Sequence, residues 1–377
     1  MPRTAATTQN LDLLRPEVVR NQMLETVDQM ERIEMGSQEG FASAMSTFPL
    51  VNLDDPKEAY YTYDGVTDAM QPVGHDAEAP LMSLDLPSKE SITVDSYKEA
   101  FNPKRGAETH SSNIPFSTYR RGVTKLNTKI WLTRELIAWR GDSAVDGLIG
   151  QWGNTKHPDI PSDHAKAVSN AWSQPSTATP YQDIEDLSFE IVNNGYMTSQ
   201  QVTPNIWMGP TTLRDLKQTD DMKGRLPNTQ FNRVTRDALQ TILSEEIANI
   251  YTVMVYYPRT NANGEFLDEA GNIVDDADDA ALDNILEPYD PSGDVVRRNV
   301  VIGRPGAGSA FFPWFLDRLT EDVGPGDVPG EMDVDEQNGF LTYVYKDPPT
   351  RNTYVQAEQE LGFHIMRGEN WGLLSGV

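Results

Sequence analysis

The chain has 377 residues, no cysteine, and 57 acidic against 31 basic residues, for a formal net charge of −26. Without cysteine, disulfides, thiolate nucleophiles and cysteine-bound metals are excluded, and such net acidity disfavours broad nucleic-acid binding, which needs clustered cations. No run of about 18 apolar residues could span a membrane, and the first residues lack the apolar segment of a secretory signal. We therefore expect no membrane span and no export by the standard secretory route.

The charge also predicts the salt conditions in which the chain works. Only 11 of the 31 basic residues are lysine. Net charge far from zero destabilises a compact state by self-repulsion, whereas molar salt shortens the Debye length to about 3 Å. An acidic, lysine-poor surface therefore favours a halophilic source over an ordinary acidic protein.

The N-terminal region is predicted to form an extended arm. Residues 1–15 are polar, and Pro16 then precedes an apolar stripe at helical spacing that ends before Gly36. Such an amphipathic helix must bury its stripe on its own body or on a partner subunit, and residues 37–80 follow as a long irregular segment. The candidate inter-subunit contacts on this stripe are Val19, Met23, Val27 and Met30.

Residues 81–125 are predicted to form a two-stranded excursion, with short strands at 81–86 and 91–97. An isolated hairpin is marginal in water, so it would need support from another chain. The segment is locally basic, and its cations either form a solvated face or contact carboxylates of neighbouring subunits. Those candidates are Lys104, Arg105, Arg120 and Arg121.

A long helix is predicted over residues 130–152, where apolar residues recur at steps of three and four. Gly141 interrupts it, because an interior glycine costs about 1 kcal/mol relative to alanine. Asp142 and Ser143 are good N-caps, so two helices joined at Gly141 are the alternative to one kinked helix.

The rest of the chain has the pattern of a mixed α/β domain. Helices are predicted around 163–172, from Pro180 to Asn194, over 210–217, from Arg236 to about 250, and over 311–319. Strands are predicted at 205–209, 251–257 and 295–302, and three strand-like runs close the chain at 340–346, 353–359 and 363–367.

No motif supports catalysis. Residues 303–309 look like a phosphate loop, but Ser309 and Ala310 stand where a lysine and a serine or threonine are needed, which favours a structural turn. The acidic run 275–279 lacks the ligand spacing of a calcium loop and is predicted to be a solvated face. His157 and His164 are predicted to cap loops rather than bind metal. We expect no enzyme activity, no cofactor and no metal.

The order of parts resembles the HK97-fold major capsid proteins of tailed double-stranded DNA viruses, above all in residues 179–218. The resemblance implies an α+β fold with N-terminal arm, E-loop hairpin, peripheral domain with a long spine helix, and axial α/β domain. The expected boundaries are 1–50 for the arm, 51–80 for its connection, 81–125 for the E-loop, 126–165 for the peripheral domain, 166–339 for the axial domain and 340–377 for peripheral return strands.

The resemblance further implies a shell protein that assembles as hexamers and pentamers around packaged double-stranded DNA, without sequence-specific binding. Its expected partners are other copies and a portal, with scaffold, protease or decoration proteins as further candidates. Its expected location is the virion, after assembly in the cytoplasm of a halophilic archaeal host. No large scaffolding extension and no cross-linking lysine–asparagine pair is identified. The alternatives are an encapsulin-like cargo shell, another virion or surface-layer component such as a tail tube protein, and a halophilic α/β enzyme.

Overall fold

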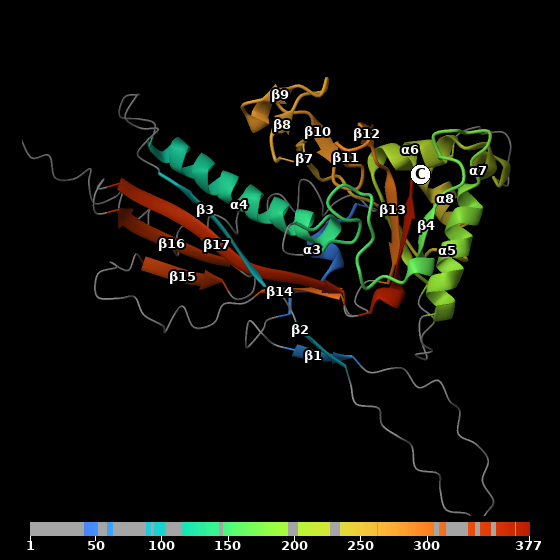
Figure 1. The fold of residues 1–377 in the computed structure, drawn as a ribbon, viewed down its shortest axis with the longest axis horizontal. Helices are drawn as coiled ribbons and strands as arrows, with labels where there is room; N and C mark the ends of the chain where they lie inside the picture. Colours follow the sequence, from blue (N-terminus) through green and yellow to red (C-terminus); the bar gives the residue numbers. More distant parts are fainter. Residues whose placement is uncertain are drawn as a thin grey trace, which may run out of the picture.

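The computed structural model describes residues 41–51, 59–62, 88–91, 94–102, 115–142, 146–194, 203–226, 234–261, 263–304, 309–313, 331–335, 340–347, 352–365 and 367–377. This part of the chain is elongated, with one five-stranded sheet and its helices at one end and a second five-stranded sheet with a long helix at the other (Figure 1). None of the described helices is long and apolar enough to cross a membrane.

The first sheet, sheet A, has the strand order β4-β18-β13-β5-β6. Alternate residues of its strands face opposite sides, as the two-residue period of a strand requires. On β5 and β13, Ile206 and Val300 enter a core shared with the helices, whereas Trp207 and Val301 enter a second core on the opposite face. The strands are β4 (Ala165–Ala167), β5 (Asn205–Met208), β6 (Ile250–Thr252), β13 (Asn299–Gly303) and β18 (Trp371–Ser375).

Four helices accompany sheet A, and α5 covers the face formed by β13 and β18 (Figure 1). On α5, Ile184, Leu187 and Ile191 are fully buried against the sheet, at the three- and four-residue spacing of one helix face. The helices are α5 (Pro180–Asn194), α6 (Pro210–Gln218), α7 (Asp220–Gly224) and α8 (Arg236–Ile242).

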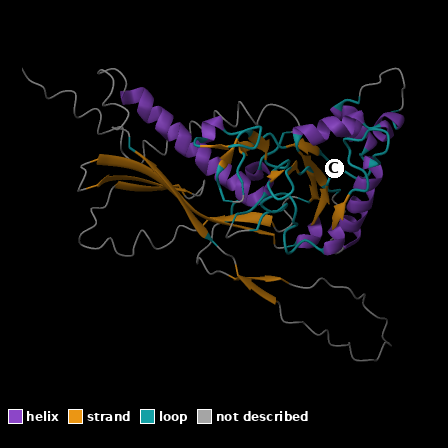
Figure 2. Cartoon of the chain, turned by 45° about the horizontal axis from the view of Figure 1, so that its top comes forward, coloured by secondary structure: helices purple, strands orange, loops and turns teal. Residues whose placement is uncertain are grey.

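The second sheet, sheet B, is organised around the 14-residue strand β17. One edge of β17 pairs with β3 and then with β14, and its other edge pairs with β16, which pairs with β15. The 25-residue helix α4 runs along β3 and β17 (Figure 2). The elements are β3 (Asp95–Phe101), α4 (Pro115–Trp139), β14 (Ser309–Pro313), β15 (Glu331–Asp335), β16 (Phe340–Asp347) and β17 (Asn352–Ile365).

One antiparallel pairing links the two sheets: β13 pairs with β18 in sheet A, and the following strand β14 pairs with β17 in sheet B. In sheet A, Gly303 lies opposite Trp371, and in sheet B, Ser309 lies opposite Ile365. The two connecting segments, residues 304–308 and 366–370, are therefore equal in length. At their sheet A end, the Arg304 amide donates to the Asn370 carbonyl at 3.1 Å. The pairing register continues unchanged from one sheet to the other.

Residues 41–51 join both sheets. Phe41 forms a parallel bridge with Thr252 of β6, and Leu50 forms one with Phe311 of β14. Between them lies the short helix α3 (Ala44–Thr47), where the Ala44 amide donates to both carboxylate oxygens of Glu135 at 2.7 and 2.9 Å. The predicted arm, residues 1–50, therefore ends inside the core, because this stretch packs between the sheets of its own chain.

The long helix differs from its prediction at both ends. It spans Pro115–Trp139 instead of 130–152, so residues 115–125 are its first turns rather than part of a hairpin. Gly141 has a φ of 73° and its amide donates to the Leu136 and Ile137 carbonyls, which is a helix stop of the left-handed glycine type. The predictions of one kinked helix and of two helices joined at Gly141 are both wrong.

The described parts of the predicted hairpin 81–125 lie in separate elements. β2 (Ser88–Ser91) pairs with β1 (Ala59–Thr62), whereas β3 pairs with β17, and residues 103–114 lie outside the described residues. At the other end of the chain, β18 belongs to sheet A, not to the sheet formed by β16 and β17. It does so because four of its five residues are buried and it fits between β13 and β4.

Other local predictions have mixed outcomes. The helix Pro180–Asn194, the strand Asn205–Met208 and the helix Pro210–Gln218 are confirmed. The helix predicted over 163–172 is wrong, because a short 3₁₀ helix (Ser162–His164) leads directly into β4. The helix predicted from residue 311 is also wrong at its start, where β14 forms a strand that pairs with β17.

Between β6 and β13 the chain forms a lobe of short antiparallel ladders. β7 pairs with β10, β8 with β9 and β11 with β12. The strands are β7 (Tyr256–Pro258), β8 (Phe266–Leu267), β9 (Ile273–Val274), β10 (Leu282–Asn284), β11 (Tyr289–Asp290) and β12 (Val295–Val296). The predicted strands 251–257 and 295–302 are each split in two.

Candidate functional site

Most of the predicted inter-subunit contacts lie outside the described residues. This applies to Val19, Met23, Val27 and Met30 of the predicted arm helix and to Lys104 and Arg105. Arg120 and Arg121 lie in the first turns of α4, and Arg121 is exposed. All eight residues remain predictions as subunit contacts.

The structure places the two α4 arginines in a wider cationic stretch. Residues 115–134 contain five basic residues and no acidic one, in a chain whose net charge is −26. The five basic residues are Arg120, Arg121, Lys125, Lys129 and Arg134. This stretch was not predicted as a unit, because the sequence pattern assigned its two halves to a hairpin and to a helix.

Two of these cations are available to a partner. Arg134 is buried and its Nε donates to Gln359 at 2.9 Å, and Lys129 pairs with Glu99 at 2.5 Å. Arg121 and Lys125 are exposed, lie four residues apart and so share one face of α4. Within the described part of the chain, no ion pair joins either of them to a carboxylate. We call Arg121 and Lys125 the α4 cation row.

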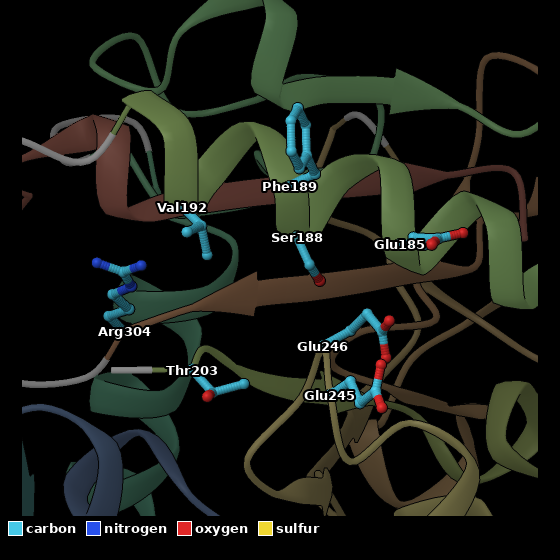
Figure 3. A pocket seen from close by; sticks show the side chains of 8 residues that line it. All are labelled: Glu185, Ser188, Phe189, Val192, Thr203, Glu245, Glu246 and Arg304. Atoms are coloured by element: carbon cyan, nitrogen blue, oxygen red, sulfur yellow. The ribbon is translucent and has the colours of Figure 1, made fainter. Parts of the chain in front are cut away.

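A concave surface lies between α5 and the segment that carries Glu245 and Glu246 (Figure 3). Its cavity has a volume of about 380 Å³. We call it the α5 groove, and its lining residues are Glu185, Ser188, Phe189, Val192, Thr203, Glu245, Glu246 and Arg304. Ser188 points from α5 towards Glu246, whereas Phe189 stands away from the cavity and is 62% exposed (Figure 3).

The α5 groove is acidic and incompletely hydrogen-bonded. Three carboxylates line it against one guanidinium, that of Arg304. One oxygen of Glu246 accepts from the Tyr181 hydroxyl at 3.1 Å, but its other oxygen, the Ser188 hydroxyl and the Arg304 Nε are buried without a hydrogen-bond partner among the described residues. Burial also lowers the pKa of Arg304. Since buried polar groups are normally paired, the groove suits a polar or charged partner.

The two histidines that the sequence offered as metal ligands make separate loop contacts. The ring of His164 is fully buried with Nδ1 3.1 Å from the Trp371 carbonyl, and His157 Nδ1 accepts from the Asp159 amide at 3.2 Å. Both histidines hold loops, as predicted. Across the described ranges, no three histidine or acidic side chains are grouped so that they could hold a metal ion. Gly303 ends β13 beneath the Trp371 ring, and residues 305–308 lie outside the described residues.

His157 makes the stability of the fold depend on pH. Burial lowers its pKa, and nearby Asp159 opposes that shift only in part. Below the unfolded pKa of about 6.5 the unfolded chain binds a proton that the folded chain does not, so stability falls as the pH drops until the folded pKa is passed. His157→Gln should therefore flatten the dependence of the unfolding free energy on pH just below about 6.5. Denaturant titrations at several pH values measure this, and equal slopes for both proteins would contradict it.

No family model matches the sequence, and no curated protein matches it. The fold is nevertheless defined: it is a mixed α+β fold of the HK97-like capsid type, which confirms the predicted fold class. Among solved structures, the chain is similar to a phage-related protein from Bordetella bronchiseptica RB50, with a TM-score of 0.52, 12% identity, and coverage of 96% of this chain and 97% of that one.

Two further similar structures are assembled particles. The capsid of Myoviridae phage XM1 has a TM-score of 0.48 and 13% identity, with coverage of 91% of this chain and 95% of that one. The virus-like particle from Pyrococcus furiosus has a TM-score of 0.46 and 9% identity, with coverage of 95% and 98%.

Proposed function

We propose that this chain is a structural subunit of a capsid shell and not an enzyme. The observation that carries the proposal is the similarity of the fold over the whole length of both chains, 96% of this one and 97% of the phage-related protein. An isolated binding domain or an enzyme that merely contained a similar core would match over only part of its length.

In the proposed shell, the chain forms hexamers and pentamers of an icosahedral capsid that encloses double-stranded DNA. Sheet A with its helices is the axial domain, sheet B with α4 is the peripheral domain, and the residues before Phe41 are an arm that contacts neighbours. A portal is a further partner, and scaffold, protease or decoration proteins are candidate partners. The protein belongs to the virion and assembles in the host cytoplasm.

We also propose that the shell is adapted to high salt, as the capsid of a virus of a halophilic archaeon would be. The support is the net charge of −26 with only 11 lysines among 31 basic residues. At about 1 M salt the Debye length is near 3 Å, so copies with this charge can approach one another without long-range repulsion.

Electron microscopy of the purified chain in molar salt tests the proposed function. We expect closed shells of uniform size, because a shell protein buries on the order of 1,000 Å² or more at each stable contact. Monomers, open filaments or tubes at high protein concentration would contradict it. Particles purified from the native source should contain DNA, whereas a protein cargo and no DNA would favour the encapsulin-like alternative.

A further inference from the structure

We infer that, within each hexamer or pentamer of the proposed shell, the lobe of one copy packs against helix α5 of the next copy. This inference rests on the proposed function, because it assigns the surfaces through which neighbouring axial domains meet. The partner is a second copy of this chain, and apolar side chains recognise it.

Exposed apolar side chains are concentrated on two surfaces. Among the described residues, nine large apolar side chains are exposed. Six of them belong to the lobe and two to α5, so these two surfaces hold eight of the nine. Single apolar residues are normal at a protein surface, whereas grouped ones mark interaction sites. The six in the lobe are Met254, Tyr256, Ile273, Leu282, Val295 and Val296.

Part of the lobe surface is an apolar face on the ladder of β7 and β10. Leu282 lies opposite Pro258 in this ladder, so its side chain points to the same side as that of Tyr256, two residues before Pro258. Tyr256 is 42% and Leu282 63% exposed, whereas their neighbours Tyr257 and Asp283, on the other side of the ladder, are buried. We call Tyr256, Leu282 and the exposed Met254 the lobe face.

The matching surface on α5 lies at the mouth of the α5 groove. Phe189 and Val192 are exposed, line the groove and share one side of the helix at a spacing of three residues. The exposed carboxylates of Glu185 and Glu245 lie at the same groove. A tyrosine on an apolar face, such as Tyr256 of the next copy, fits both parts. Its ring can pack on the apolar side chains while its hydroxyl donates to a carboxylate.

The two surfaces lie on opposite faces of sheet A. The lobe residues Ile285 and Leu286 belong to the core that contains Val301 of β13. Helix α5 packs on the core that contains Val300, which points to the other face, so the lobe and α5 lie on either side of β13 (Figure 1). They therefore cannot meet within one chain. Between copies they form a heterologous contact, which closes into a ring such as a hexamer or pentamer where the rotation allows it.

Apolar contacts also suit the high salt proposed for this protein. Both surfaces have carboxylates nearby, Glu185 and Glu245 at the groove and Asp275 and Asp276 in the lobe, so neighbouring copies repel one another through them. Molar salt limits this repulsion to about 3 Å, whereas the burial of apolar surface needs no opposite charges. The contact should therefore form in molar salt and weaken on dilution.

Disulfide trapping tests the contact in the full chain, which has no cysteine of its own. Phe189→Cys is combined in turn with Met254→Cys, Tyr256→Cys and Leu282→Cys. A disulfide needs Cα atoms about 4.4–6.8 Å apart, so we expect mild oxidation of assembled particles to link neighbouring copies in at least one of the three variants. Non-reducing gels should then show a ladder that extends to five and six linked chains.

A matched control moves one cysteine away from the contact. Phe189→Cys with Arg214→Cys should give no ladder, because Arg214 is 64% exposed on α6 and belongs to neither surface. Each single-cysteine variant can link at most two chains. A ladder in the control as strong as in the three test variants would count against the inference.

Single substitutions test the contact without cysteines. Leu282→Asp and Phe189→Asp should each raise the protein concentration needed for assembly at least about tenfold, because each places a carboxylate in an apolar contact. Both side chains are exposed, so folding should be kept, as circular dichroism can check. Val51→Asp changes the ninth exposed side chain, outside both surfaces, and should leave the threshold within about twofold. Light scattering measures the threshold.

The outcomes separate the inference from the proposed function. Closed wild-type shells with no ladder from any of the three pairs, or normal assembly of both aspartate variants, would overturn the inference and leave the shell function intact. Shells without ladders in which the thiol of Leu282→Cys resists alkylation would assign the lobe face to another occupant, such as the residues before Phe41, and would also overturn it. Wild-type tubes or filaments that give ladders from the same pairs would support the contact and contradict the shell.

Discussion

Phe48→Ala is expected to lower the free energy of unfolding by about 3–5 kcal/mol, the largest effect of any single substitution considered for this chain. Phe48 is 1% exposed, and its ring centroid lies 5.0 Å from that of Phe363 and 5.4 Å from that of Trp371. Trp139 and Phe311 lie at 5.7 and 6.1 Å. Truncation would therefore leave a cavity where α4, β14, β17 and β18 meet.

Chemical denaturation of the wild type and the variant measures this effect. Val51→Ala is the matched control, because Val51 belongs to the same segment but is 42% exposed, and it should change stability by less than about 0.5 kcal/mol. If the two substitutions had equal effects, residues 41–51 would not connect the two sheets as described.

Dilution from molar salt into about 10 mM salt should dissociate assembled particles, because the Debye length grows from about 3 to about 30 Å. Each chain carries a formal charge of −26, so neighbouring copies would then repel one another over the whole width of their contacts. Sedimentation at stepwise sodium chloride concentrations measures the assembled fraction. We expect the particles to disappear before the monomer unfolds.

Sucrose at matched osmotic strength separates charge screening from water activity. It should not replace salt, because a neutral solute does not shorten the Debye length. Particles that stay intact in dilute buffer would contradict the salt adaptation. They would leave the shell function itself untouched.

Local sequence patterns predicted the elements whose start and stop signals lie within them. Helix α5 was predicted because Thr179 and Pro180 begin it and an apolar stripe defines its buried face. The prediction placed helix α4 too late in the chain because it treated Gly141 as a kink, whereas Gly141, with a φ of 73°, ends the helix. The Leu148 and Ile149 amides then bond the Ala138 and Trp139 carbonyls at 3.0 and 2.8 Å, and the apolar spacing of residues 130–152 does not reveal these bonds.

Pairing across the chain explains the other errors. Residues 309–313 form a strand because β17 pairs with them, whereas their own apolar run fits a helix equally well. Strand β17 was divided in the prediction because Glu360, Leu361 and Gly362 interrupt the pattern, although Glu360 and Leu361 are buried in one continuous ladder. The α5 groove could not be predicted, because its residues range from Glu185 to Arg304 and meet only in the folded chain.

Strands β13 and β14 pair with β18 and β17 in one continuous register. The lengths of the two connecting segments, 304–308 and 366–370, therefore depend on each other. Deleting one residue from 304–308 alone would shift one ladder by a single step, and a single step exchanges the two faces of a strand. In sheet A, residues of β13 that enter the two opposite cores, such as Val300 and Val301, would then change places. An insertion or deletion in 304–308 is therefore tolerable only with an equal change in 366–370. Natural variants of this chain should gain or lose the same number of residues in both connecting segments.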